Sequence, residues 1–320
     1  MTRLPTLIEL DQEIARRSLS EFCKMAWHVL EPATPIKWGW ALDAMCEHLE
    51  AVHNGQIKRL LMNVPPGMMK SLLTGVFFPA WEWGAGGNPS LRYLTTAHKE
   101  DLAIRDNLKC RRLISSDWYQ ERWSVELCGD QNAKKKFENT ATGFRESMAF
   151  RSLTGSRGDR IIIDDPLSVD DAFSQAALLS AETTFLEAVP SRVNNSDSAI
   201  IVIMQRLHER DTSGGELLFP ERFTAAQVDE MEKVMGGYAV AGQFQQRPVP
   251  RGGGLFKSDW VQYWDTLPER FDASAISWDM TFKDSKASDF VVGQVWGRKD
   301  GCFYLIDQFR GQWDFVKTLE

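Results

Sequence analysis

The chain has 320 residues, and its 37 Lys and Arg against 44 Asp and Glu give a net charge of −7. With 43% hydrophobic and 25% charged residues, the composition is typical of a globular protein and excludes an intrinsically disordered chain. It also excludes a strongly basic nucleic-acid coat protein, so any contact with nucleic acid has to come from a local basic patch. The length suits two domains of roughly 150 residues each.

Cysteine usage and hydropathy indicate an intracellular protein. The 5 cysteines are scattered and form no pair at the spacing of a zinc site, which favours a reducing compartment over a disulfide scaffold. No apolar run approaches the roughly 20 residues that cross a bilayer. The first ten residues carry Glu9 and do not form the apolar segment of a signal peptide.

Helices and strands are expected to alternate over most of the chain. Residues 1–58 are predicted to be helical, because apolar residues recur at near-helical spacing over 6–30 and 42–52. Strands are predicted at 59–64, 91–96, 160–163 and 199–204, and helices at 71–83 (kinked or broken at Pro79), 98–114 and 171–189. This alternation predicts an α/β domain with a parallel sheet over residues 59–242.

The character of the sequence changes after residue 242. Residues 243–256 are rich in Gln, Pro and Gly and are interpreted as a linker. Three β-like runs follow at 273–279, 290–297 and 302–307, and a turn at 298–301 joins the last two. Residues 257–320 are therefore predicted to form an antiparallel meander, and this second domain is expected to be incomplete because it is small for a catalytic domain.

The first predicted strand runs into a degenerate form of the phosphate-binding motif GxxxxGK[ST], read over residues 64–71. Its two glycine positions hold Val64 and Met69. Lys70 is predicted to reach the β- and γ-phosphates, and the Ser71 hydroxyl to ligate Mg²⁺. Backbone N–H groups from Gly67 to Ser71 would cradle the anion.

An alternative interpretation of this segment is a proline turn that caps an ordinary helix. In either case Lys70 is expected to be exposed when no nucleotide is bound, so its removal should cost little stability.

The strand at 160–163 ends in two carboxylates, Asp164 and Asp165. The first is predicted to hold magnesium, and the second to act as the base that polarises the attacking water. The alternative is an Asx-type turn before Pro166. At the end of the next strand, Gln205 is the candidate sensor of the γ-phosphate. Arg206 follows it and could contact a phosphate or a neighbouring subunit; the alternative is that it belongs to a surface loop.

Six segments, in this order along the chain, resemble segments of the large terminase subunit of tailed bacteriophages. They lie at 35–52, 63–73, 153–167, 204–211, 244–256 and 277–297. The resemblance implies an α/β P-loop NTPase of the ASCE or RecA-like type, followed by an RNase H-like nuclease domain. It implies a motor that uses ATP and Mg²⁺ to move double-stranded DNA into a procapsid in the host cytoplasm.

The resemblance also implies partners and nucleotide-site residues. Members of this family form a homo-oligomeric ring on the portal protein, and the small terminase subunit selects the DNA. Before it assembles into the ring, the protein could be a monomer in solution. The adenine-side segment contains Trp40, followed by Ala41 where relatives often have His. The implied cofactor-binding residues continue through Pro66, Gly67, Met68, Met69, Lys70, Ser71 and Leu72.

For the nuclease, the resemblance implies a site that uses Mg²⁺ or Mn²⁺ to cut concatemeric DNA. Asp279, at a strand end, is expected to be its first metal ligand, with Asp289 and Asp307 as weaker candidates. One carboxylate does not hold a pair of cations. The family's other ligands would lie beyond Glu320, so we expect that this chain alone does not cleave DNA.

A basic stretch precedes the acidic strand. Residues 131–160 carry seven basic side chains against three acidic ones. Lys134, Lys135 and Lys136 are candidates for contacts with DNA phosphates, and Arg157 for an arginine finger; the alternative is a solvated loop.

Two other functions remain open from the sequence. One is another P-loop ATPase, such as a helicase. The other is a non-hydrolysing nucleotide-binding interaction module, in which Met69 and Asp165 mark a decayed site.

Overall fold

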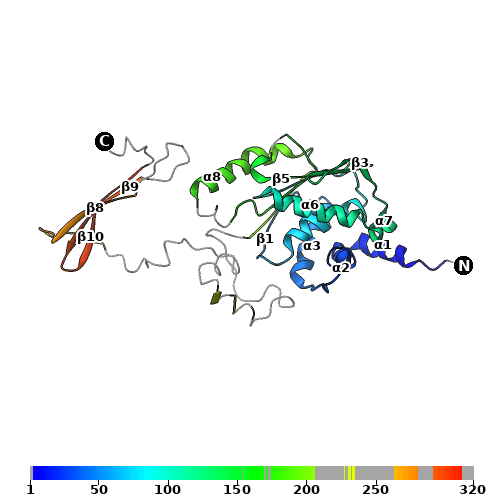
Figure 1. Cartoon of the computed structure of the whole chain (residues 1–320), viewed down its shortest axis with the longest axis horizontal. Helices are drawn as coiled ribbons and strands as arrows, with labels where there is room; N and C mark the ends of the chain where they lie inside the picture. Colours follow the sequence, from blue (N-terminus) through cyan, green and yellow to red (C-terminus); the bar gives the residue numbers. More distant parts are fainter. Residues whose placement is uncertain are drawn as a thin grey trace. The chain divides into compact units, whose positions relative to one another are not determined.

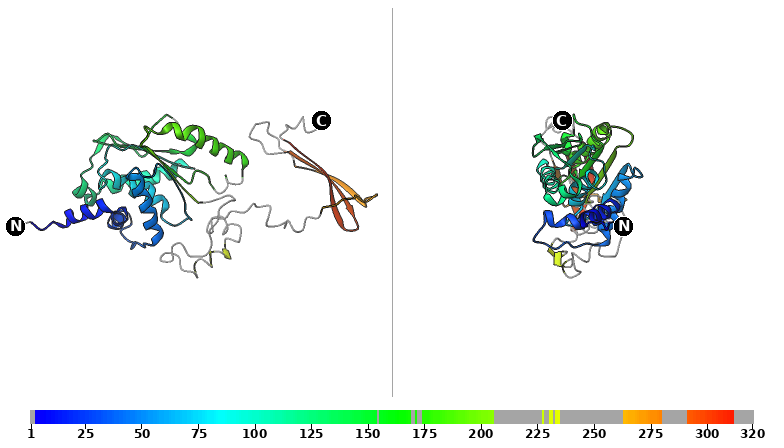
Figure 2. Two further views of the ribbon diagram at one scale, coloured as in Figure 1. Left: turned by 180° about the vertical axis from the view of Figure 1, so that it is seen from behind. Right: turned by 90° about the vertical axis from the view of Figure 1, so that its right-hand side faces the viewer.

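The computed structural model describes residues 3–153, 155–168, 171, 174–205, 263–279 and 291–311, with isolated positions between 227 and 234. The chain divides into two compact units (Figures 1 and 2). One consists of Met1–Ala172 and Ala181–Arg251, and the other of Phe173–Ser180 and Gly252–Glu320. The expected linker at 243–256 lies outside the described residues, and the predicted domain boundaries stay a prediction. None of the helices described is long and apolar enough to cross a membrane.

A seven-stranded sheet forms the centre of the first unit (Figure 1). Five parallel strands lie in the order β1 (Arg59–Asn63), β7 (Ala199–Met204), β6 (Arg160–Asp164), β2 (Tyr93–Ala97) and β5 (Phe144–Ala149). Antiparallel β4 (Lys136–Asn139) and β3 (Leu127–Asn132) follow β5. The prediction of a mainly parallel α/β sheet is confirmed, whereas β3, β4 and β5 were not predicted.

Several helices pack in the first unit: α1 (Leu7–Arg17), α2 (Leu19–Leu30), α3 (Trp40–His53), α6 (Glu100–Ile114) and α7 (Asp117–Trp123). A further helix, α8 (Gln175–Thr183), begins in the segment assigned to the second unit and ends in the first. The apolar period over residues 6–30 predicted helical structure, and the structure has two helices there, divided at Ser18. This residue is extended, and its hydroxyl accepts the backbone N–H of Glu21 as the N-cap of α2.

The helix after β1 consists of α4 (Lys70–Leu72), a π-helical turn (Leu73–Phe77) and α5 (Phe78–Trp83). The chain was expected to kink or break at Pro79, but helical structure continues through it. The irregular hydrogen bonding lies just before it, where the N–H of Phe78 reaches the carbonyl of Leu73. Pro79 has no N–H to donate to the preceding turn, and the wider π turn before it accommodates the missing hydrogen bond without a break in the helix.

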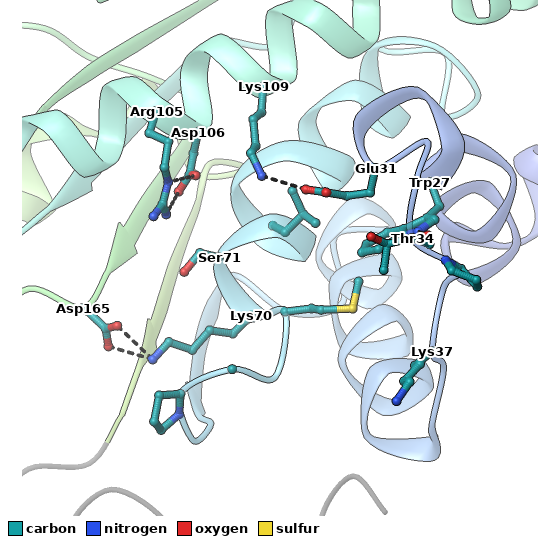
Figure 3. Close-up of a pocket in the computed structure, with 15 residues that line it drawn as sticks. Trp27, Glu31, Thr34, Lys37, Lys70, Ser71, Arg105, Asp106, Lys109 and Asp165 are labelled. Atoms are coloured by element: carbon teal, nitrogen blue, oxygen red, sulfur yellow. Dashed lines mark hydrogen bonds and ion pairs between the residues drawn. The ribbon is translucent and has the colours of Figure 1, made fainter. Parts of the chain in front are cut away.

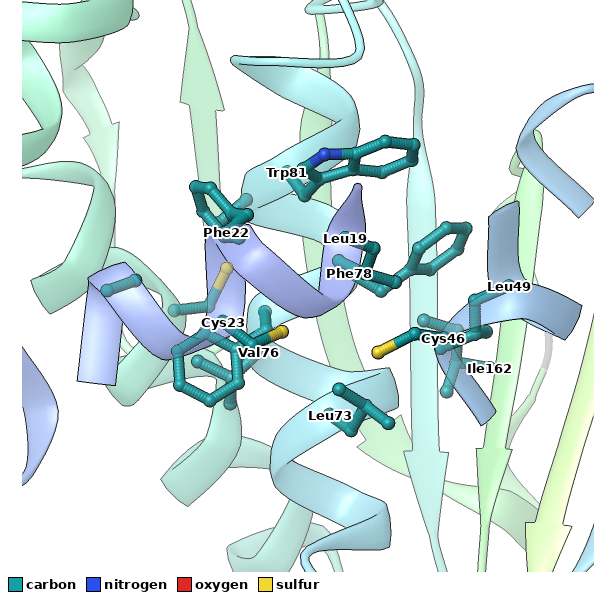
Figure 4. Packing of buried hydrophobic residues seen from close by; sticks show 14 of the residues in the cluster. Leu19, Phe22, Cys23, Cys46, Leu49, Leu73, Val76, Phe78, Trp81 and Ile162 are labelled. Atoms are coloured by element: carbon teal, nitrogen blue, oxygen red, sulfur yellow. The ribbon is translucent and has the colours of Figure 1, made fainter. Parts of the chain in front are cut away.

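Both faces of the sheet are buried, because its central strands are continuous apolar runs. Ile162 and Ile201 point to one core, together with residues of α2, α3 and the helix after β1 (Figure 4). Ile161, Ile163 and Ile200 point to a second core on the other face. This alternation follows from the two-residue period of a strand.

The second unit holds three antiparallel strands in the order β10 (Cys302–Gly311), β9 (Val291–Lys299) and β8 (Ala273–Asp279). Asp300 and Gly301 join β9 to β10 with φ values of 51° and 81°. Two left-handed residues in succession are typical of a type I′ turn, which matches the twist of a hairpin. The predicted meander is confirmed.

A buried carboxylate ties the first unit together at one end of its sheet. Glu82 of α5 has no exposed surface, and it accepts hydrogen bonds from Arg160 Nη2 at 2.8 Å, His53 Nδ1 at 3.1 Å and the Tyr93 hydroxyl. Burial alone would raise the pKa of Glu82, but the hydrogen bonds and charges of His53 and Arg160 outweigh it and hold the pKa below its usual value. The helix after β1 is thereby fixed to the start of β6.

We predict that Glu82→Gln lowers the free energy of unfolding by about 3–5 kcal/mol at neutral pH, because the buried Arg160 guanidinium loses its counter-charge. Urea denaturation measures the change, with Glu126→Gln, at an exposed position just before β3, as a control that should leave the midpoint unchanged. Since the pKa of Glu82 is lowered on folding, its contribution is present above its ordinary value of 4.5 and is lost as the pH falls through the folded pKa. The deficit of Glu82→Gln should therefore shrink in acid, and a deficit independent of pH would contradict this account.

Candidate nucleotide-binding site

The loops after β1 and β6 meet at one edge of the sheet, because parallel strands present their carboxyl ends on the same side. An ion pair joins them directly. Lys70 Nζ lies 2.8 Å from Asp165 Oδ2 and 3.0 Å from Oδ1, across 95 positions of sequence. Strand β7 lies between β1 and β6, and the backbone N–H of Gln205 at its end donates to Asp165 Oδ1 at 2.8 Å.

The loop after β1 has the backbone of a glycine-containing turn. Gly67 has a φ of 79°, and Met69 has a φ of 59° and a ψ of 9°, which is left-handed. Met69 stands at the second glycine position of the phosphate-binding motif. A non-glycine residue in this conformation costs about 1–2 kcal/mol. The loop therefore keeps a shape that favours glycine although the glycine is missing.

This strain predicts an unusual order of stability at position 69. Met69→Gly should be more stable than Met69→Ala by about 0.5–1 kcal/mol, because both lose the same packing and only glycine relieves the left-handed backbone. Thermal unfolding of the two variants side by side measures the difference. An alanine variant as stable as the glycine variant would show that Met69 is unstrained.

Lys70 is buried, which makes the expectation of an exposed side chain wrong. Only 5% of it is accessible, because its ammonium group is directed at Asp165 and lies 3.5 Å from the carbonyl of Val64. The sequence does not reveal this contact, since the partner follows a strand that is distant in the chain.

We therefore predict that Lys70→Ala lowers the free energy of unfolding by about 1–3 kcal/mol, because Asp165 keeps only the Gln205 N–H as a partner. Lys109→Ala breaks a half-exposed pair with Glu31 in the same pocket and should cost less than about 1 kcal/mol. Adding Asp165→Asn to Lys70→Ala should restore part of the loss in denaturant titrations. Equal stability of Lys70→Ala and the wild type would refute the pairing.

The two acids at the end of β6 have different surroundings. Asp164 Oδ1 is buried without a hydrogen-bond partner. Burial, and then the charge of Asp165, raise the pKa of Asp164 to about 7, although a hydrogen bond with the Ser71 hydroxyl lowers it. Hydroxyl and carboxylate oxygens are the ligands that Mg²⁺ prefers. Ser71 and Asp164 thus fit the predicted magnesium ligands.

The loop and the ion pair form one wall of an open pocket of about 670 Å³, a volume suited to a small ligand (Figure 3). Of the predicted residues, the lining includes Pro66, Gly67, Met69, Lys70, Ser71, Leu72 and Asp165. Met68 is buried in the core instead. Trp40, proposed for the adenine side, is 59% exposed at the start of α3 and does not line this pocket.

Two groups of lining residues were not predicted from the sequence. The end of α2 and the segment after it contribute Trp27, Glu31, Thr34, Pro35 and Lys37, and α6 contributes Arg105, Asp106 and Lys109. The spacing of the α6 residues places them on one side of a helix. This spacing could have indicated a common surface, but not that the surface faces the phosphate loop.

The other predicted catalytic residues, Gln205 and Arg157, do not line the pocket. The side-chain Oε1 of Gln205 is buried without a partner. Arg157 is exposed before β6, outside the pocket lining, and makes no ion pair with the residues described. Arg206 lies outside the described residues. The roles of Gln205 and Arg157 stay predictions.

The lysine run lies in and beside the hairpin that joins β3 to β4, rather than in a long loop. Lys135 pairs with Glu100 at 2.8 Å, and the Lys136 ammonium lies 4.5 Å from the centre of the Phe144 ring. The backbone carbonyl of Lys134 accepts a hydrogen bond from Asn107, while its side chain is exposed. Only the charge of Lys134 is thus free for a ligand among these three.

The predicted nuclease carboxylates do not form a metal site in the part of the chain that is described. Asp279 pairs with Val292 on β9, whereas Asp307 lies opposite Val295. Asp279 and Asp307 lie on strands two positions apart in the sheet and are offset by three residues along the strand direction. Their Cα atoms are therefore about 14 Å apart. Asp289 lies outside the described residues, and the described ones contain no group of three metal-ligating side chains. The nuclease stays a prediction.

Comparison of the sequence with protein-family models gives no match, and comparison with curated proteins gives none either. The fold is similar to that of solved structures. The HK97 bacteriophage large terminase is 11% identical, over 90% of this chain and 67% of that chain, with a TM-score of 0.47. The large terminase of a thermophilic bacteriophage is 10% identical in complex with ADP (85% and 69% covered, TM-score 0.43) and with ATP-gamma-S (85% and 68% covered, TM-score 0.39). Such values establish neither family nor function.

Proposed function

We propose that this chain is a P-loop ATPase of the ASCE or RecA-like type that drives double-stranded DNA into a tailed-bacteriophage procapsid. The observation that carries the ATPase proposal is the meeting of Lys70 and Ser71 with Asp164 and Asp165 beside one pocket. The packaging role rests on the resemblance of six ordered segments to large terminase subunits.

In this proposal the chain's own groups divide the work on ATP. Backbone N–H groups of the loop from Gly67 to Ser71 hold the β-phosphate, and the Lys70 ammonium holds the γ-phosphate. Ser71 and Asp164 hold Mg²⁺, which supplies positive charge against the phosphate oxygens. Asp165 orients the attacking water and accepts its proton.

The Lys70–Asp165 pair adds a condition to this mechanism. The Asp165 carboxylate is bound to the Lys70 ammonium group at 2.8 Å and has to exchange this partner before it can orient a water. A γ-phosphate offers Lys70 a partner of higher charge, so its arrival would release Asp165 to the water. The base would then become available only after the nucleotide is bound.

We predict that Lys70→Ala lowers the kcat for ATP hydrolysis by at least about 100-fold, because the γ-phosphate loses its cation in the transition state. Asp165→Asn should keep ATP and magnesium binding and lose turnover to a similar degree, while Asp164→Asn should weaken the magnesium-dependent part of binding. Phosphate release measures turnover, and titration calorimetry measures binding. Glu13→Gln is the control. Activity of Lys70→Ala within a few-fold of the wild type would overturn the ATPase proposal.

The same assay separates this function from its rivals. A packaging ATPase should be stimulated by the small terminase subunit with procapsids, where the chain would assemble as a ring on the portal protein in the host cytoplasm. A helicase should unwind DNA without them. Absence of turnover under all conditions would favour the non-hydrolysing interaction module.

For DNA engagement, we predict a difference between two neighbouring lysines. Lys134→Gln should weaken DNA binding and reduce the slope of log Kd against log salt by up to about 1, because one phosphate contact is lost. Lys135→Gln is the matched control and should change the slope less, since Glu100 already neutralises Lys135. Fluorescence anisotropy over a salt series measures the slopes of both variants. Identical slopes for Lys134→Gln and Lys135→Gln would show that this hairpin is a solvated surface that does not contact DNA.

We propose Asp279 as a ligand of Mg²⁺ or Mn²⁺ in the cutting of concatemeric DNA, because it stands at a strand end. The residues described supply no second carboxylate beside it. Calorimetric titration with Mn²⁺ tests the assignment without relying on cleavage, and Asp279→Ala should bind the ion more weakly than the wild type.

A further inference from the structure

Arg145 of β5 is a buried charge without a counter-charge. Its side chain has no exposed surface, and none of its three nitrogens has a hydrogen-bond partner among the residues described. An uncompensated buried guanidinium strongly destabilises a fold, so its presence calls for a partner that this conformation does not provide.

Helix α6 places two side chains beside Arg145. Asp106 and Cys110 are four residues apart and so share one side of the helix. Burial raises the pKa of the Cys110 thiol, while the charge of Arg145 and a weak contact of the thiol with the guanidinium lower it, which places this thiol beside Arg145. A thiol is a weak acceptor and does not neutralise a charge. Asp106 is the carboxylate that could.

Gly75 is a common neighbour of the two charged side chains. A Cβ atom at this position would lie 3.9 Å from Arg145 Nη2 and 3.9 Å from Asp106 Oδ2, so these atoms are at most about 8 Å apart. A change of side-chain rotamer covers such a distance. Gly75 itself belongs to the π turn of the helix that begins at the phosphate loop.

In this structure Asp106 is bound by its neighbour instead. Arg105 Nε and Nη2 donate to the two carboxylate oxygens at 2.9 and 3.1 Å. Consecutive helical residues point about 100° apart, so Arg105 has to fold back to make this contact. The Arg105 side chain is 53% exposed, whereas that of Asp106 is only 8% exposed. Arg105 can therefore leave Asp106 toward solvent or the pocket without crossing the core, and the buried carboxylate would then need another cation.

Arg105 is also directed at the phosphate end of the pocket, where Figure 3 shows it above Ser71. The hydrogen bonds with Asp106 raise the pKa of Arg105 most, and the charge of Asp164 raises it further. A guanidinium so close to the magnesium ligands is placed to take a phosphate with two N–H groups.

We propose that Arg105 binds the terminal phosphate of the nucleotide, and that Asp106, once released, pairs with Arg145. This inference rests on the proposed nucleotide site. Binding would exchange a half-buried pair for a fully buried one, so the uncompensated charge of Arg145 in the empty state would favour the bound state. Arg105 is then a binding residue, and Asp106 and Arg145 are positioning residues that act through it.

The first test compares nucleotides with and without the terminal phosphate. Kd values for ATPγS and ADP, each with Mg²⁺, are measured by calorimetry for Arg105→Gln and for Arg112→Gln, an exposed residue of α6 outside the pocket. Arg105→Gln should weaken ATPγS binding by about 10-fold or more and ADP binding by less than about 3-fold. Arg112→Gln should change neither. Equal binding by Arg105→Gln and the wild type would overturn the inference alone, whereas a wild type that binds neither nucleotide would overturn the proposed site as well.

The second test addresses Arg145 without relying on turnover. Arg145→Met should raise the melting temperature of the nucleotide-free protein, because an unpaired buried charge is removed, and should weaken ATPγS binding by about 10-fold. In the Asp106→Asn background, Arg145→Met should alter ATPγS binding by less than about 2-fold. Arg145→Met with a lower melting temperature and unchanged affinity, or one that does not fold, would show a purely structural arginine.

The third test restricts the two charged side chains at their common neighbour. Gly75→Ala meets only ordinary van der Waals contacts, so it should fold, yet its methyl group would lie 3.9 Å from both Asp106 Oδ2 and Arg145 Nη2 and limit their movement. It should weaken ATPγS binding and leave the melting temperature of the nucleotide-free protein nearly unchanged. Gly129→Ala, which meets no neighbouring atom, is the control. Equal ATPγS affinity of the two glycine variants would contradict the exchange.

Discussion

The buried carboxylate of Glu82 is the interaction on which the geometry of the first unit depends. It joins the end of the helix after β1 to Arg160, the first residue of β6. Lys70 lies at the start of that helix, and Asp165 follows the last residue of β6. At about 1.5 Å per helical residue and 3.3 Å per strand residue, the two segments have similar lengths. Fixing one end of this pair of elements therefore brings Lys70 and Asp165 together at the other end.

The sequence was informative where a short run of apolar or β-branched residues forms a parallel strand. The runs that became β1, β2, β6 and β7 are of this kind, so their positions, and the edge where Lys70 and Asp165 meet, could be predicted. The strands β3, β4 and β5, which form one side of the sheet, could not, because charged residues such as Lys136 and Glu146 interrupt their pattern. Their order depends on pairing with distant strands, which local propensity does not encode.

Other differences arise from side-chain contacts between remote segments. The burial of Lys70 depends on Asp165, and the pocket lining depends on how α2 and α6 pack, so Trp27 was missed and Trp40 was chosen on resemblance alone. The break at Ser18 was visible in principle. Ser18 and Glu21 have the spacing of a capping box, but the apolar period runs across them. Apolar periodicity alone therefore missed two kinds of contact: charge pairs between remote segments and the local cap at a helix start.

Four strained or unsatisfied residues lie at the phosphate loop and at the carboxyl ends of β6 and β7. Met69 and Asp165 have left-handed backbones, and Asp164 Oδ1 and Gln205 Oε1 are buried without partners. Each of these features lowers the stability of the empty protein, and each would be relieved or used when a charged ligand enters. Strained and unpaired groups of this kind are typical of a binding site, where they lower the stability of the empty protein and can interact with the ligand.

The π turn between Leu73 and Phe77 has a consequence for how this chain tolerates insertions and deletions. A π turn contains one residue more than an α-helical turn. Deleting one residue between Leu73 and Phe77 would therefore give a regular turn and keep Glu82 facing Arg160, because the wider turn accommodates the extra residue. Adding or removing a residue elsewhere between Lys70 and Glu82 would rotate Glu82 by about 100°, away from Arg160. This helical segment should thus accept the loss of one residue at the π turn and no other change in length.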